Sequence, residues 1–185
     1  MLTETPVIEP SSTMREVLAA FPGAQRALFR RYHIGGCSSC AFSPEETLAQ
    51  LCRRNGGLDV LEVLAHLQSS HEQDARILLS PQDAAARLQS DPSILLLDVR
   101  SREEFEAVRI AGSVLLSQPV MREILGAGTN TRPIIIVDHQ GKMALDAAAY
   151  FLGHGLQNVS CLRGGIDAWS REVDPNVRRY KVTDS

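Results

Sequence analysis

The sequence predicts a two-domain α/β protein, in which a small all-α N-terminal domain precedes a parallel-sheet domain with helices on both faces. In the first seventy residues, apolar side chains recur at helical spacing. From about residue 75 onward, short and almost wholly apolar strand patterns alternate with helix patterns, which is typical of a parallel sheet buried on both sides. Three of the four cysteines fall within residues 37–52, which indicates that the two parts do different work.

Composition narrows the class of protein. The chain has 185 residues, of which 44% are hydrophobic and 22% charged, with a net charge of −3, as in soluble globular proteins. Its basic residues are scattered and form no concentrated stripe, so we expect no nucleic-acid partner. No apolar run approaches the roughly 20 residues that span a bilayer, and the N-terminus lacks the features of a secretory signal. We therefore expect no membrane association and a cytoplasmic location; nothing in the sequence indicates an oligomeric state.

The predicted N-terminal domain spans residues 6–68 and begins with two helices. Thr13 and Glu16 have the spacing of a capping box at the start of "MREVLAAF". Pro22 and Gly23 end that helix, and "AQRALFRRYHI" resumes the helical pattern until Gly35 and the glycine after it.

Two further helices complete this domain. "PEETLAQLCRR" is predicted to be helical with Ser43 as its N-cap and Pro44 in its first turn. A last helix, "VLEVLAHL", follows Asp59, which can cap it. The polar residues 69–74, "SSHEQD", carry no periodicity and are predicted to be a linker.

The second predicted domain spans residues 75–180. Ser80-Pro81 and the pair Ser101/Glu104 are helix-start signals within it. The strands expected in order are 77–79, 93–99, 112–116 (a short strand or a turn), 133–137 and 158–162. The expected helices are 82–89, 101–108, 143–153 and 166–171. A polar stretch that includes "GAGTNTR" is expected to connect the third strand to the fourth.

Two motifs of the second domain resemble the signatures of the rhodanese-like superfamily. They are "LLLDVRSREEFEAVRIAGSVLL" (95–116) and "NVSCLRGGIDAW" (158–169). The resemblance covers about residues 75–180 and implies a structural role for Asp98, Arg100 and Glu104. In that family, the strand that corresponds to 134–137 ends in a catalytic cysteine. The cysteine begins a six-residue loop whose backbone N–H groups converge on a persulfide or an anion, and the loop usually closes with an arginine.

The corresponding loop here lacks that cysteine. It reads Asp138, His139, Gln140, Gly141, Lys142, Met143. The resemblance implies that Asp138 replaces the cysteine and Met143 the arginine, giving a degenerate active site. The same N–H groups can hold a carboxylate, but a carboxylate cannot accept sulfane sulfur, so we expect Asp138 to occupy the anion site and thiosulfate sulfurtransferase activity at this loop to be absent. In an alternative hypothesis, Asp138 is itself a nucleophile or base.

Cys37 and Cys40 form a CxxC motif just before a predicted helix start, where free N–H groups favour thiolate. Residues 6–68 around the motif resemble the helical redox-disulfide domain associated with hybrid-cluster proteins. This resemblance implies that Cys37 and Cys40 are a cysteine pair with redox or sulfur-related work. For a redox pair, we expect a thiol or persulfide protein as partner.

Two other interpretations of the cysteines remain open. A metal or iron–sulfur site at Cys37 and Cys40 is one, although no cofactor is predicted; a zinc site needs four ligands, so Cys52 and either His33 or His66 would have to complete it. Inert thiols in a tight turn are the other. Cys52 falls on the apolar side of its helix and Cys161 in a buried strand, and both are expected to be core residues.

The preferred hypothesis is a CxxC thiol–disulfide or persulfide domain fused to a catalytically degenerate rhodanese-like domain that acts in partner binding or regulation. A second hypothesis is a non-catalytic binding module whose cysteines are structural or bind metal. A third is a sulfurtransferase in which Cys37 or Cys40 takes over from the lost loop cysteine.

Overall fold

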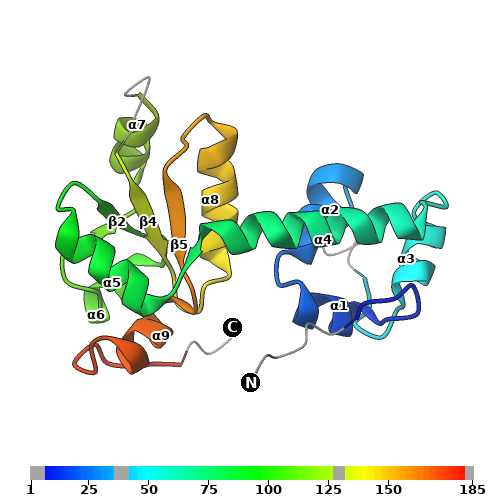
Figure 1. Cartoon of the computed structure of the whole chain (residues 1–185), viewed down its shortest axis with the longest axis horizontal. Helices are drawn as coiled ribbons and strands as arrows, with labels where there is room; N and C mark the ends of the chain where they lie inside the picture. The colour runs from blue at the N-terminus through cyan, green and yellow to red at the C-terminus, as the bar shows by residue number, and fades with distance from the viewer. Residues whose placement is uncertain (1–6, 36–41, 127–131, 182–185) are drawn as a thin grey trace. The chain divides into compact units, whose positions relative to one another are not determined.

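A computed structural model describes residues 7–35, 42–126 and 132–181 of the chain (Figure 1). The chain divides into two compact units, Met1–Arg76 and Ile77–Ser185. None of the helices within the described ranges has the length and apolar content that crossing a membrane requires.

The described part of the first unit is helical, as predicted. Its helices are α1 (Met14–Ala20), α2 (Ala24–Tyr32), α3 (Leu48–Arg54) and α4 (Val60–Ile77). The capping box at Thr13 is confirmed, because the Thr13 side chain accepts a hydrogen bond from the Glu16 N–H while the Glu16 carboxylate accepts one from the Thr13 N–H. Asp59 caps α4 by accepting a hydrogen bond from the N–H of Leu61 (2.9 Å).

Two helix ends differ from the sequence prediction. Helix α3 begins after Thr47, not after Ser43, because the chain before it pairs with the start of α1: the N–H of Met14 donates to Glu46 O at 2.8 Å. Helix α2 ends at Tyr32, and its C-cap, His33, takes the left-handed conformation (φ 56°) two residues before Gly35.

The segment 69–74, predicted to be a linker without helical periodicity, is helical and lies inside α4. Its polar sequence is held by contacts with earlier helices, since Asp74 forms a largely buried ion pair with Arg26 and the His71 ring lies 5.1 Å from that of Phe21. Tertiary contacts therefore extend the helix to the boundary between the two units.

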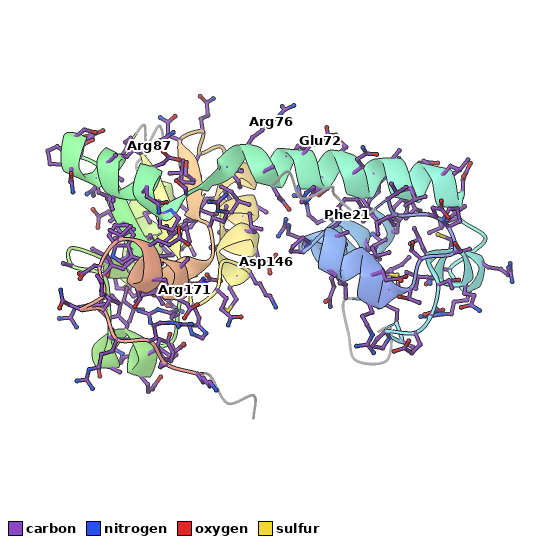
Figure 2. The ribbon with its side chains drawn as sticks, turned by 60° about the horizontal axis from the view of Figure 1, so that its bottom comes forward. Phe21, Glu72, Arg76, Arg87, Asp146 and Arg171 are labelled. Atoms are coloured by element: carbon purple, nitrogen blue, oxygen red, sulfur yellow. The ribbon has the colours of Figure 1, made fainter. Side chains whose placement is uncertain are left out.

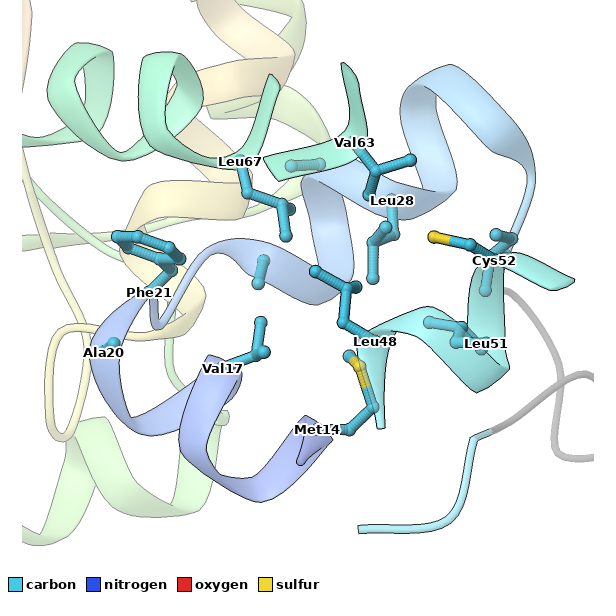
Figure 3. Packing of buried hydrophobic residues seen from close by; sticks show 13 residues of the cluster. Met14, Val17, Ala20, Phe21, Leu28, Leu48, Leu51, Cys52, Val63 and Leu67 are labelled. Carbon is cyan, nitrogen blue, oxygen red and sulfur yellow. The ribbon is translucent and has the colours of Figure 1, made fainter. Parts of the chain in front are cut away.

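The first unit has its own hydrophobic core, built from all of these helices (Figure 3). Its most buried members include Met14, Val17, Leu28, Leu48, Leu51, Cys52, Val63 and Leu67. Cys52 is confirmed as a core residue, 2% exposed, and burial, with a smaller contribution from Asp59, raises the pKa of its thiol.

The second unit contains a five-stranded, all-parallel sheet of order β1-β5-β4-β2-β3. The sheet strands are β1 (Leu78–Leu79), β2 (Leu95–Asp98), β3 (Val114–Leu115), β4 (Ile134–Val137) and β5 (Val159–Leu162); the helices described here are α5 (Pro81–Ser90), α6 (Arg102–Ala107), α7 (Gln118–Gly126), α8 (Met143–Gly153) and α9 (Gly165–Glu172). The central strand β4 pairs Ile136 with Leu97 of β2 and with Cys161 of β5. The expected α/β architecture is confirmed.

Helices cover both faces of the sheet. Leu97 and Ile136 pack with α7 and α8, whereas Leu96 and Ile135 point to the opposite face and pack with α5 and α9.

The charged side chains labelled on helices in Figure 2 are all exposed: Glu72, Arg76, Arg87, Asp146 and Arg171. Helix α7 falls in the stretch predicted to be a polar connection, where Ile124 is its buried residue.

Candidate functional site

The loop after β4 is organised around the carboxylate of Asp138, which is 2% exposed. This carboxylate accepts hydrogen bonds from the backbone N–H groups of Gly141, of Met143 (2.6 Å) and of Ala144 (3.2 Å). Met143 and Ala144 are the first two residues of α8, so the free N–H groups and the positive end of the helix dipole both stabilise the negative charge. The three N–H groups form a cradle that the carboxylate fills.

The start of α9 forms backbone hydrogen bonds with the 138–143 loop. The N–H of Ile166 donates to Asp138 O (2.8 Å), and the N–H of Asp167 donates to His139 O (3.2 Å). Gly165 is required at this contact, because a Cβ there would lie 2.5 Å from Asp138 O, and its φ of +60° is left-handed. The "RGG" segment, residues 163–165, therefore places the start of α9 directly against the backbone of the 138–143 loop.

A buried ion pair follows β2. Nη2 of Arg100 lies 2.7 Å from Oδ2 of Asp98, and neither side chain is more than 1% exposed. Burial alone would lower the pKa of Arg100, but hydrogen bonds with Asp98 and Tyr180 raise it overall. This confirms the structural role expected for Asp98 and Arg100.

A C-terminal segment, residues 177–181 and here called the strap, packs against the loop. The rings of His139 and Tyr180 stack with centroids 4.4 Å apart, and His139 Nε2 donates to the carbonyl oxygen of Tyr180 (3.1 Å). Arg179 binds Asp167 (2.6 Å), and this hydrogen bond is the main reason that the pKa of Asp167 is lowered. No sequence pattern predicts the strap, because an irregular segment held by tertiary contacts has no periodicity.

The loop and the strap line an open cleft of about 670 Å³. Its rim includes Gln140, Lys142, Met143, Arg179, Tyr180 and Lys181. The Met143 side chain is 59% exposed, so its backbone N–H serves the cradle while its side chain faces outward.

The structure describes two of the four cysteines, Cys52 and Cys161. Cys37 and Cys40 lie outside the described residues. Cys161 is fully buried and its thiol donates to Ala144 O (3.2 Å), which confirms it as a core residue. Within the described ranges, no group of three or more His, Cys, Asp or Glu residues could hold a metal ion.

The fold of the second unit agrees with comparisons to known proteins. Residues 80–172 match the rhodanese-like domain family, and the chain belongs to that family. It is 30% identical over 97 residues to the thiosulfate sulfurtransferase GlpE of Tolumonas auensis, covering 52% of this chain and 90% of GlpE. It is 25% identical over 171 residues to the adenylyltransferase and sulfurtransferase UBA4 of Candida albicans, covering 88% of this chain but only 38% of UBA4.

Among solved structures, the rhodanese-like domain of the Anabaena sp. Alr3790 protein is similar, with a TM-score of 0.46 and 19% identity over 59% of this chain and 92% of that domain. The two sulfurtransferase relatives support a role for this chain related to sulfur, without specifying a reaction.

Proposed function

We propose that the rhodanese-like domain binds or regulates a partner and does not transfer sulfur, while the CxxC motif of the N-terminal domain carries thiol–disulfide or persulfide chemistry. The observation that supports the first half is the Asp138 carboxylate, which fills the cradle of loop N–H groups. By the family resemblance, this is the position of the sulfur-accepting cysteine.

The cradle is closed to a second anion for an electrostatic reason. Two unit charges 4 Å apart repel by about 4 kcal/mol at an effective dielectric constant of 20. A repulsion of that size weakens binding by about a thousandfold. Thiosulfate would meet this repulsion at Asp138 and would find no thiolate to receive its sulfur.

Support for the second half comes from the CxxC motif in the sequence and from the burial of the other two cysteines in the structure. Cys52 and Cys161 are both buried, so the CxxC pair, Cys37 and Cys40, is the remaining candidate for thiol chemistry. A CxxC pair can exchange with a thiol or a persulfide on a partner protein. The helix start expected directly after the pair lies further along the chain, because α3 begins at Leu48.

The test is sulfur transfer from thiosulfate to cyanide, measured on the wild type and on Asp138→Cys/Met143→Arg. We expect no turnover by the wild type and measurable turnover by the double variant, because the cradle then surrounds a thiolate. Gln140→Cys is the matched control, since it places a thiol in the same loop outside the cradle.

Turnover by the wild type would contradict the proposal. If that turnover disappeared in Cys37→Ser/Cys40→Ser, the CxxC pair would be the sulfur carrier and the third hypothesis would replace this one.

A further inference from the structure

The chain contains only two lysines, Lys142 and Lys181, against 17 arginines. They are 39 positions apart in the sequence, yet both line the cleft between the loop and the strap. The hydrogen bond from His139 to the carbonyl oxygen of Tyr180 brings the two segments together, because Lys181 follows Tyr180 and Lys142 is three residues beyond His139.

The carboxylates of the cleft are already satisfied within the fold. Asp138 is held by three backbone N–H groups, Glu104 accepts from the hydroxyl of Tyr180 (2.7 Å), and Asp167 binds Arg179. The oxygens of these three carboxylates therefore accept hydrogen bonds from groups of the protein itself.

The two lysines are different. Both side chains are exposed, and within the described ranges neither forms an ion pair. An ammonium group has three donors and no acceptor, so the charged groups that form no ion pair on the described part of this rim are donors. A ligand of the cleft must therefore supply acceptors, and carboxylates match a pair of ammonium groups best.

The rim also has an apolar component. The exposed Met143 side chain lies beside Lys142, and methionine is enriched at protein interfaces. A cleft of about 670 Å³ is within the range of sites that enclose a ligand and can hold a short peptide segment.

From these observations we propose that the cleft binds an acidic peptide segment of a partner protein, with carboxylates between Lys142 and Lys181 and an apolar side chain on Met143. This inference rests on the proposed function and names the chemistry of the partner. It moves anion recognition from the loop amides, which Asp138 occupies, to the two lysine side chains.

The probe is a fluorescein-labelled peptide of alternating glutamate and leucine, titrated with the full chain and followed by fluorescence anisotropy. We expect saturable binding that weakens at least tenfold in Lys142→Gln/Lys181→Gln and survives in Lys142→Arg/Lys181→Arg, because arginine keeps the charge. Arg178→Gln is the matched control, since Arg178 lines a neighbouring cavity but not this cleft.

Chemical modification gives a second readout that does not depend on substitutions. Acetylation of the two lysines removes their charge and is expected to abolish binding, whereas reductive methylation keeps the charge and is expected to preserve it. The bound peptide should also protect both lysines from the acetylating reagent, as measured by mass spectrometry.

Several results would overturn the proposal: equal binding of a glutamine–leucine peptide, unchanged affinity of Lys142→Gln/Lys181→Gln, or displacement by free succinate at the concentration at which the peptide itself binds. The last result would assign the cleft to small dicarboxylates. None of these changes affects Asp138, so a failure here is distinguishable from a failure of the sulfur-transfer test.

Discussion

At the scale of single residues, the hydroxyl of Tyr180 joins the strap to the end of β2 and the start of α6. It accepts a hydrogen bond from Nη1 of Arg100 (2.8 Å) and donates one to Glu104 (2.7 Å). Burial is the largest cause that raises the pKa of Tyr180 to about 12, and the hydrogen bond to Glu104 adds to it. Burial would also raise the pKa of Glu104, but hydrogen bonds from Tyr180 and Ser101 lower it overall.

Tyr180 should therefore titrate late and affect stability at high pH. Its folded-state pKa of about 12 lies above the ordinary value of 10.0, so the neutral hydroxyl is favoured by folding. Its contribution to stability is complete below pH 10.0 and is lost as the pH rises through about 12. The ultraviolet absorbance of tyrosinate, compared between the wild type and Tyr180→Phe, should differ by one group with a midpoint near 12.

The control for this titration is Tyr150→Phe. Tyr150 is a half-exposed residue of α8, and its hydroxyl is not part of the Arg100–Glu104 network. A Tyr180 midpoint near the ordinary value of 10.0 would contradict the assignment.

Local sequence predicts some site residues and not others. The 138–143 loop could be located because a strand, a glycine-containing loop and a helix are continuous in sequence. Arg179 and Tyr180 could not, because their roles depend on where an irregular segment packs. The scarcity of lysine is visible in the sequence, but the placement of Lys142 and Lys181 on the same cleft depends on the tertiary structure.

At the scale of elements, the contact between the start of α9 and the 138–143 loop is made by backbone atoms. Gly165 is the residue that permits it, both by its left-handed φ and by its missing Cβ. The carbonyl of Asp138 is thereby fixed to the N–H of Ile166, which sets the position of the cradle.

Substitution of Gly165 should damage this junction more than substitution of a comparable glycine elsewhere. Gly112→Ala is the matched control, because its φ is +80° but no atom lies within 4 Å of the added Cβ. The control should lose about 1–2 kcal/mol from backbone strain. Gly165→Ala should lose about 1–3 kcal/mol more from overpacking. Urea denaturation measures both, and equal losses would show that the close approach is unimportant.

Element boundaries were predictable where the signal was local. The cap at Thr13 and the capping box at Ser101 start helices as the sequence predicted. The start of α3, the length of α4 and the existence of α7 were missed, because pairing with α1, the Arg26–Asp74 ion pair and the burial of Ile124 are contacts between distant segments.

At the scale of the whole molecule, the two units have separate hydrophobic cores. The chain has one tryptophan, Trp169, which is buried in the second unit. Its fluorescence therefore reports on the rhodanese-like unit alone, whereas circular dichroism records helices from both units.

Destabilising one core should separate these two signals. Leu28→Ala empties a fully buried position of the first unit and should cost about 2–5 kcal/mol there. Circular dichroism should then show an early unfolding phase, while the denaturation midpoint of Trp169 fluorescence stays unchanged. Leu97→Ala, in the second unit, should instead shift the fluorescence midpoint. A fluorescence shift in Leu28→Ala would show that the two units unfold as one.

The Asp138 cradle also bears on how the protein responds to its chemical environment. The carboxylate is a ligand attached to its own receptor, so its effective concentration at the N–H groups of Gly141, Met143 and Ala144 is fixed by the covalent chain and does not vary with the composition of the solution. Free phosphate or sulfate would have to compete with the Asp138 carboxylate, whose local concentration stays constant when the solution is diluted. The occupancy of the cradle is consequently insulated from changes in the concentration of free anions around the protein.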